Sequence, residues 1–279
     1  MGGMVEVREW GRDDSVPFVR VPGPADDKYS RGVVAVRTGS AAYPGAAVLS
    51  VEAAWRTGAG YVRYLGSAAD AVLARRPETV AAQDIGRTRA DAWVIGSGTD
   101  AASRTSEETD ALRTVLDGTA PVVVDAGALD LAPGAAAPLL VTPHAGEFVR
   151  LRERLSLAPD GSGDRAADAA QTAGALGRTV LLKGSRTIIA SSDGSVIALP
   201  PAPGWLATAG SGDVLAGVLG ALLAANRGAS VAETGAAGAW LHGHAARLAA
   251  GMVDGGAGHP IVALDVAEAL PHAIADLLS

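Results

Sequence analysis

A glycine-rich turn that leads directly into an apolar helix is the stretch of this sequence best suited to chemistry. It covers residues 204–217, and one carboxylate, that of Asp213, lies where the turn meets the helix. The first turn of a helix has backbone N–H groups without intrahelical partners, and these groups attract anions together with the helix dipole. Gly210 and Gly212 allow the backbone to come close to a ligand. The stretch therefore predicts an anion-binding site.

Asp213 has two possible roles at this junction. As a helix cap it would stabilise the helix by about 1 kcal/mol, which is the commoner role for an isolated turn of this kind. A carboxylate beside an anion site repels a phosphate, however, so its position asks for a functional reason. As a general base it could take a proton from a hydroxyl while the N–H groups stabilise a transferring phosphoryl group. The rest of the chain favours the general base.

Composition excludes several classes of function. The chain has 279 residues, of which 48% are apolar and 4% aromatic, and its formal net charge is −7. This acidic balance argues against nucleic acid or an anionic membrane as the main partner. The absence of cysteine excludes disulfides, thiolate catalysis and cysteine-ligated metals, and it fits a cytoplasmic location. The polar first residues, MGGMVEVREWGRDD, are not typical of a signal peptide or a membrane span.

Buried strands alternate with helices along the chain. Strands are expected at 33–36, 61–65, 92–95, 121–124, 139–141 and 180–182, with a hairpin at 187–191 and 196–199. Helices are expected at 45–57, 67–75, 102–117, 145–153, 164–176, 231–250 and 264–278, besides the one that follows the glycine-rich turn and extends to Ala225. This alternation predicts an α/β fold with a mostly parallel central sheet and helices on both faces.

The ends of the chain give two further expectations. Pro17, Pro22 and Pro24 predict an extended arm without regular structure over residues 1–28, so that residues 29–279 form a single domain. In the last helix, Asp265 is a candidate cap and Pro271 is expected to bend or split the helix.

Residues of reactive or small type follow several of the expected strands. They are Thr38, Gly39 and Ser40; Gly96, Ser97 and Gly98; Asp125; Thr142, Pro143 and His144; and Lys183 and Gly184. Each alone has an ordinary explanation as a turn, a cap or a solvated strand end. Ligands of parallel sheets bind at the carboxyl ends of the strands, however, and these groups would converge there with Asp213. Together they indicate a ligand site.

Other kinds of site find little support. The chain has neither a G-x-x-x-x-G-K-[ST] loop nor a G-x-G-x-x-G motif opening its first βα unit. His242 and His244 fall in one expected helix, where their i, i+2 spacing directs the rings to different sides. They therefore make a poor metal site.

The motifs resemble those of a known family, the ADP-dependent NAD(P)H-hydrate dehydratases of the ribokinase-like superfamily. The most specific segments are TPHAGEF at 142–148, VVDAGAL at 123–129 and ATAGSGDVLAG at 207–217. Further matches lie at 28–32, 43–47, 96–98 and 182–187, in the same order, so the resemblance covers residues 28–250. It implies a ribokinase-like fold.

The resemblance also implies an activity, the repair of damaged nicotinamide cofactor by a lyase. The substrate would be the S-epimer of NADH or NADPH hydrated on the nicotinamide ring. ADP would phosphorylate the ring hydroxyl and leave as AMP, and loss of phosphate would then restore the dihydropyridine. Phosphate is a good leaving group where hydroxide is a poor one. Mg²⁺ is expected because it bridges phosphates in such transfers, although the sequence names no ligand for it.

Family positions carry over to this chain residue by residue. Those that match contacts to the hydrated dinucleotide are Ala46, Gly98, His144 and Asp213, with Asp213 as the catalytic base. Those that match the adenine-nucleotide site are Lys183, Gly184, Ser185, Arg186, Thr187 and Gly212. The anion hole for the phosphoryl group would be the backbone N–H groups of Ala209, Gly210, Ser211 and Gly212.

Two residues depart from the family pattern. Ser97 stands where the family usually has proline, and Ala209 stands where it usually has glycine. If the turn needs a positive φ at position 209, alanine is strained there and phosphate binding is weaker. Neither change removes a reacting group.

The resemblance extends to partners. The family suggests a homotetramer, and its members are often fused to an epimerase domain. This chain is too short to hold one, so epimerisation is expected from another protein or from the missing part of a longer parent.

Two other functions remain open. The first is an ATP-dependent ribokinase-like kinase of a small vitamin alcohol or sugar, which shares the G-x-G-D motif. The second is a non-catalytic nucleotide-binding module, for which Ser97 and Ala209 are the only support. His144 within T-P-H-x-G-E favours the dehydratase. The sequence decides neither between ADP and ATP nor between hydrated NADH and hydrated NADPH.

Overall fold

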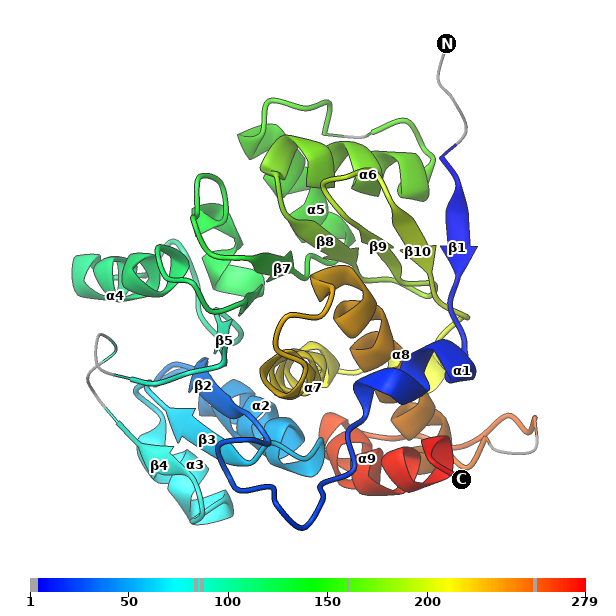
Figure 1. The fold of residues 1–279 in the computed structure, drawn as a ribbon. Helices are drawn as coiled ribbons and strands as arrows, with labels where there is room; N and C mark the ends of the chain where they lie inside the picture. The colour runs from blue at the N-terminus through cyan, green and yellow to red at the C-terminus, as the bar shows by residue number, and fades with distance from the viewer. Residues whose placement is uncertain (1–4, 83–84, 86–87, 160, 253–254) are drawn as a thin grey trace.

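The centre of the molecule is one twisted sheet (Figure 1). The computed structural model describes residues 5–82, 85, 88–159, 161–252 and 255–279. The sheet has the strand order β1-β10-β9-β8-β7-β6-β5-β2-β3-β4. The strands are β1 (Val7–Glu9), β2 (Val33–Arg37), β3 (Tyr61–Tyr64), β4 (Val80–Ala81), β5 (Ala92–Ile95), β6 (Val122–Val124), β7 (Leu139–Val141), β8 (Thr179–Leu182), β9 (Ile188–Ala190) and β10 (Val196–Ala198).

Pairing within the sheet is parallel except around β9, which runs antiparallel to both β8 and β10. The hairpin expected at this place is therefore β9–β10. Because successive side chains of a strand point to opposite faces, the short strands contribute to two cores. In β2, for example, Val34 and Val36 belong to one apolar cluster and Ala35 to the other. The prediction of a mostly parallel sheet is confirmed.

Helices cover both faces. One face carries α2 (Pro44–Arg56), α7 (Ser211–Ala225), α8 (Val231–Ala249) and α9 (Ala263–Leu277), which pack against one another. The other side carries α4 (Ser106–Leu116), α5 (Ala145–Arg154), α6 (Arg165–Leu176) and a 3-10 helix, η2 (Ala126–Leu131). Helix α3 (Ala69–Arg75) packs against α2, and the 3-10 helix η3 (Gly204–Leu206) contacts α8. Among the described residues, no helix is both long and apolar enough to cross a membrane.

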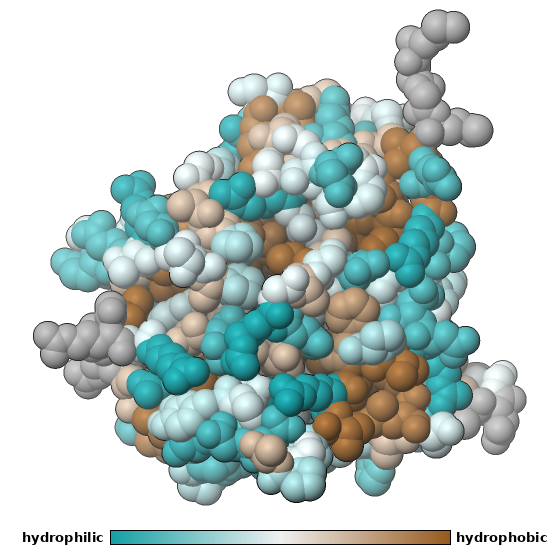
Figure 2. All heavy atoms as spheres, viewed as in Figure 1, coloured by the Kyte–Doolittle hydropathy of each residue, from teal (hydrophilic) through white to brown (hydrophobic). Residues whose placement is uncertain are grey.

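The surface is mixed in polarity. Figure 2 shows polar residues over much of the viewed face and a concentration of apolar residues in the area of α9. Val262 and Leu278, at the two ends of α9, are among the exposed large apolar residues.

Helix α7 is buried on nearly all sides. Glycines at its contacts let it lie closer to α2 and β5 than larger residues would allow. A Cβ atom on Gly217 would lie 2.2 Å from the carbonyl oxygen of Ser50 in α2. A Cβ atom on Gly220 would lie 2.3 Å from Cγ2 of Val94 in β5. These two glycines therefore set the position of α7 between α2 and the sheet, and with it the position of its first turn.

The prediction of an extended arm without regular structure over residues 1–28 is wrong within the described residues. Strand β1 pairs in parallel with β10 and is followed by α1 (Arg12–Ser15) and a 3-10 helix, η1 (Val16–Phe18). Trp10 is only 3% exposed, and its indole N–H donates to Oγ of Ser15 over 2.9 Å. Pro17 is accommodated because it lies in the first turn of η1, where no intrahelical N–H bond is lost. Residues 1–4 lie outside the described residues.

The last helix differs from its prediction in one respect. Helix α9 continues through Pro271, so the expected split is wrong. Pro271 is exposed, while Val266, Leu270 and Ala273 are buried and hold the helix against its neighbours. The Asp265 carboxylate accepts the backbone N–H of Val262 over 2.8 Å at the start of the helix. Tertiary packing thus outweighs the hydrogen bond that proline cannot make.

We expect Gly217→Ala to lower the free energy of unfolding by about 1–3 kcal/mol, because the added methyl group must push α7 away from the Ser50 carbonyl. The matched control is Gly174→Ala in α6, where a Cβ atom meets nothing within 4 Å. That change should raise stability by up to about 1 kcal/mol through helix propensity. Urea denaturation measures both. Equal effects of the two substitutions would contradict the close packing of α7.

Candidate active site

Asp213 lies in the first turn of α7. The residue before this helix, Gly210, has φ of +86°, and no side chain caps the helix. The capping role considered for Asp213 is therefore not the one it has. The first-turn amides lack intrahelical acceptors, as expected for an anion site. Ala209 does not have a positive φ, which among the described non-glycine residues is confined to Ala126 and Ser156. The strain considered for Ala209 does not arise.

A buried group of polar side chains lies at the carboxyl ends of four adjacent strands. Asp125, which follows β6, is 3% exposed and is its centre. Nζ of Lys183 lies 2.7 Å from Oδ1 of Asp125. The hydroxyl of Thr142 donates to the same oxygen over 2.8 Å, and that of Ser97 donates to Oδ2 over 2.9 Å. The expected convergence of these strand ends is thus present in the structure.

This group acts on the protonation of Asp213. Burial, reinforced by the negative charge of Asp125, raises the pKa of Asp213 to about 6. The positive charge of Lys183 opposes that rise in pKa. Asp213 is therefore mostly ionised at neutral pH yet has a high proton affinity for an aspartate. Such a pKa close to the working pH suits a general base.

Two residues expected to bind substrate, Ala46 and Gly98, are in direct contact. Gly98 has φ of +68°, and a Cβ atom on it would lie 2.3 Å from Cβ of Ala46. The preceding residue, Ser97, is fully buried, and its carbonyl accepts the N–H of Gly39 over 2.7 Å. Hydrogen bonds from Ser97 thus fix this loop without the family's proline.

His144 combines a structural role with an exposed polar group. Its Nδ1 accepts the backbone N–H groups of Gly146 (3.0 Å) and Glu147 (3.4 Å), so it caps α5. The Glu147 carboxylate in turn accepts the N–H of His144 over 2.8 Å. Because Nδ1 accepts, the proton of the neutral ring lies on Nε2, which can donate and lies 3.3 Å from Oε1 of Glu147. The side chain is 56% exposed.

A cavity of about 400 Å³ lies on one side of the buried polar group. Residues expected at a nucleotide site line it: Lys183, Gly184, Ser185, Thr187, Ser211 and Gly212. Lys183 links the cavity to the helix, since its Nζ lies 3.6 Å from where a Cβ atom of Gly212 would be. Arg186 is not in the lining. Its guanidinium bonds instead to the Glu9 carboxylate and to the Leu199 carbonyl.

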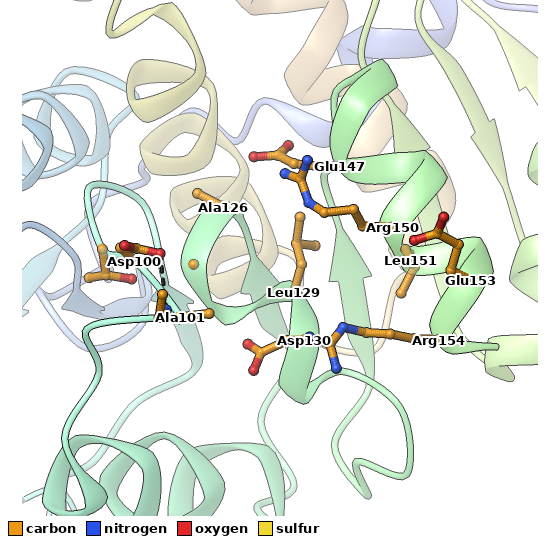
Figure 3. Close-up of a pocket in the computed structure, with 13 residues that line it drawn as sticks. Asp100, Ala101, Ala126, Leu129, Asp130, Glu147, Arg150, Leu151, Glu153 and Arg154 are labelled. Carbon is orange, nitrogen blue, oxygen red and sulfur yellow. Dashed lines mark hydrogen bonds between the residues drawn. The ribbon is translucent and has the colours of Figure 1, made fainter. Parts of the chain in front are cut away.

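A second cavity, of about 780 Å³, lies on the other side (Figure 3). Its wall includes Thr99, which follows Gly98, and Ala126, which follows Asp125. Glu147 also lines it, and Oε2 of Glu147 lies 3.8 Å from Nζ of Lys183. Lys183 and its two carboxylate neighbours thus lie between the two cavities.

Comparison with known proteins agrees with this geometry. The sequence profile of the NAD(P)H-hydrate dehydratase family matches residues 34–255. The ADP-dependent (S)-NAD(P)H-hydrate dehydratase of Neisseria meningitidis is 36% identical over 255 residues, which are 80% of this chain and 81% of that protein. The chain belongs to the NAD(P)H-hydrate dehydratase family.

Longer members of the family are also similar. The bifunctional NAD(P)H-hydrate repair enzyme Nnr of Mycobacterium tuberculosis is 49% identical over 214 residues, 73% of this chain. The match spans only 43% of that enzyme, so the chain covers less than half the length of this relative.

Solved structures establish the fold. The ADP/ATP-dependent NAD(P)H-hydrate dehydratase from Bacillus subtilis, co-crystallised with ATP and Mg²⁺, superposes with a TM-score of 0.85 at 26% identity, covering 98% of this chain and 100% of that one. A ribokinase-like superfamily protein from Enterococcus faecalis has a TM-score of 0.82 at 22% identity, covering 97% and 96%. The expected ribokinase-like fold is confirmed.

Sequence reasoning missed one buried residue of this dehydratase-family site. His242 lies in the wall of the smaller cavity and is 6% exposed. Burial lowers its pKa to about 4, and its Nε2 has no hydrogen-bond partner in the described part of the chain. His244 has different surroundings, since its Nε2 lies 2.6 Å from the Asp276 carboxylate. The i, i+2 spacing predicted this divergence, but no pattern in the sequence pointed His242 at a cavity.

Asp213 should make the fold less stable at high pH. Its raised pKa means that the folded state holds this proton more tightly than the unfolded state does. The stabilisation is complete below the unfolded pKa, near 4, and is lost as pH rises through about 6. Asp213→Asn should therefore raise the melting temperature relative to wild type more at pH 8 than at pH 5. Thermal unfolding at the two pH values measures this, and an unchanged difference would contradict it.

Proposed function

We propose that this protein dehydrates the S-epimer of hydrated NADH or NADPH at the expense of ADP, with AMP and phosphate as the other products. The observation that carries the proposal is Asp213, an aspartate with a pKa of about 6 in the uncapped first turn of α7. Two cavities, one on either side of Lys183 and its carboxylate neighbours Asp125 and Glu147, provide space for two substrates. The meningococcal relative is an ADP-dependent (S)-NAD(P)H-hydrate dehydratase, which supports the use of ADP and of the S-epimer.

The proposed reaction has two stages. Asp213 takes the proton of the ring hydroxyl while the hydroxyl oxygen attacks the β-phosphorus of ADP, and AMP leaves. First-turn amides, among those of Ala209, Gly210, Ser211 and Gly212, stabilise the charge on the phosphoryl group in transfer. The carbon–oxygen bond then breaks with its electron pair on phosphate, and the neighbouring ring carbon loses a proton. The dihydropyridine is restored.

The smaller cavity is the proposed place for ADP. Lys183, Gly184, Ser185, Thr187 and Gly212 line it, as the family pattern expects for a nucleotide. The Bacillus subtilis relative was crystallised with ATP and Mg²⁺, which supports nucleotide binding by this fold. For Arg186 we propose only a main-chain contribution, because its side chain bonds to Glu9 and Leu199.

The residues at the site fit a magnesium ion held mainly by nucleotide phosphates. Within the described ranges, no three His, Asp or Glu side chains are grouped so as to hold a metal. Asp125 has its oxygens engaged by Lys183, Thr142 and Ser97, and Asp213 is the proposed base, which leaves the nucleotide phosphates as the main ligands for such an ion. Magnesium commonly binds one or two carboxylates together with substrate phosphates. When bound, it would neutralise phosphate charge.

The hydrated nicotinamide ring is proposed to bind between Gly98 and His144. Gly98 and Ala46 have no side-chain atoms beyond Cβ, so they leave room for the ring. The Nε2–H group of His144 supplies a hydrogen-bond donor at the opposite side, and Asp213 supplies the base.

For partners we propose a homotetramer and an epimerase. The bifunctional mycobacterial relative supports an epimerase in another protein or another part of a longer chain.

The proposal is tested by incubating the protein with hydrated NADH, magnesium and either ADP or ATP. Recovery of dihydronicotinamide absorbance with release of AMP and phosphate supports the proposal with ADP. A kinase would instead accumulate a phosphorylated alcohol, and a binding module would bind nucleotide without turnover. No recovery by folded protein that binds ADP would refute the dehydratase.

Asp213→Asn should lower kcat by about 10²- to 10⁴-fold, the usual contribution of a general base. ADP binding, measured by calorimetry, should change little, because the first-turn amides remain. Asp110→Asn, an exposed aspartate in α4, is the matched control and should retain full activity. Retention of kcat in Asp213→Asn would exclude the base role.

The pH profile should report the same carboxylate. We expect kcat/KM to rise with pH through about 6, as Asp213 loses its proton. Asp125→Asn removes a negative charge that raises this pKa, so the rising limb should move to lower pH by up to about one unit. Initial rates with hydrated NADH from pH 5 to 9 measure the shift. A limb at the same pH in both proteins would contradict the link between Asp125 and Asp213.

A further inference from the structure

The larger cavity is lined by two arginines that make no ion pair within the described part of the chain. Arg150 and Arg154 lie one turn apart on α5 and both line the cavity. Figure 3 shows their side chains extending from α5 across the cavity towards η2. Within the described residues, neither guanidinium has a hydrogen bond or ion pair with protein. Nη1 of Arg150 lies 3.9 Å from where a Cβ atom of Gly146 would be, so it reaches back towards the His144 end of the helix.

Most acidic residues in the cavity wall have other partners and do not form ion pairs with Arg150 or Arg154. Asp130 is paired through both carboxylate oxygens with Arg104. Glu147 is engaged by the N–H of His144 and faces Lys183. Asp100 accepts the N–H of Ala102 over 3.0 Å. Of the four carboxylates in the wall, three thus have partners, and the remaining one is Glu153.

The mixture of groups is that of a site for a nucleoside phosphate. Arginines bind phosphate oxygens through paired N–H groups. Carboxylates such as Asp100 can accept hydrogen bonds from ribose hydroxyls, as they do in dinucleotide sites. Leu129 and Leu151 add apolar surface for a base. A volume of about 780 Å³ is within the usual range for a ligand of this size.

The cavity also starts where the reacting ring is proposed to lie. Thr99 follows Gly98, Ala126 follows Asp125, and Glu147 is in the first turn of the helix that His144 caps. A dinucleotide with its nicotinamide at Gly98 and His144 can therefore extend its other half into this cavity. We propose that Arg150 and Arg154 bind the phosphates of the adenosine half of the hydrated dinucleotide. This inference rests on the proposed function and names how that substrate is held.

The test uses three substrates that differ in the adenosine half, with the 279-residue protein. They are hydrated NADPH, hydrated NADH and hydrated reduced nicotinamide mononucleotide, which lacks the adenosine half. For Arg150→Ala and Arg154→Ala we expect KM for the two dinucleotides to rise about 10-fold or more, since hydrogen bonds to charged groups are strong. With the mononucleotide, kcat/KM should stay within about two-fold, as should KM for ADP throughout. Arg113→Ala, at an exposed arginine of α4 outside the cavity wall, should change none of these values.

The outcomes separate the possible contacts. A larger loss with hydrated NADPH than with hydrated NADH assigns the arginines to the 2′-phosphate, and equal losses assign them to the pyrophosphate on the adenosine side. An equal loss with the mononucleotide, or no loss with any substrate, overturns the inference. If wild-type protein turns over none of the three, the proposed function fails. Calorimetric titration of hydrated NADPH into wild type and both variants then still tests the arginines, and equal binding overturns their role.

Discussion

The close packing of α7 against α2 and the sheet is the constraint on which the site depends. Gly217 and Gly220 let the helix lie where its first turn meets the carboxyl ends of the central strands. That turn is left without a side-chain cap, and the burial that comes with this packing raises the pKa of Asp213. The same packing that stabilises the core therefore produces a carboxylate with an unusual proton affinity. Structure and chemistry at this place have a single cause.

Lys183 offsets part of the negative charge that Asp125 and Asp213 bring to the site. A buried carboxylate without a partner is costly, and Asp125 has three donors from three different strand ends. Asp213 has weaker compensation, since Lys183 acts on it through charge while the Ser97 hydroxyl donates to Asp125. The two aspartates thus have different environments. The Asp125 carboxylate has hydrogen-bond donors on both oxygens, whereas the Asp213 carboxylate takes up a proton more readily than an ordinary aspartate. Different environments for neighbouring carboxylates are a common way to divide roles within an active site.

The sequence predicted the sheet and the convergence of strand ends because these depend on local patterns. Strand and helix periodicity placed most elements within a few residues, and reactive types after the strands indicated one edge. Other features depend on contacts far apart in the chain. Strand β1 is three residues long and forms only because β10 pairs with it, while Arg186 turns away because Glu9 is near. His242 shows no sign in the sequence that its ring lines a cavity, because a side chain's surroundings follow from tertiary packing alone.

The parallel pairing of β1 with β10 has a consequence for how this chain can be shortened. Val7 pairs with Val196, so the first strand of the chain covers the outer edge of a strand formed almost two hundred residues later. An uncovered edge presents free N–H and C=O groups to any other extended chain. A fragment that begins after Trp10 would leave β10 open and remove an indole from the core. Strand β1 itself forms that edge of the sheet, so the N-terminal segment replaces the apolar edge of β10 with a short strand that carries Arg8 and Glu9, which disfavours edge-to-edge aggregation.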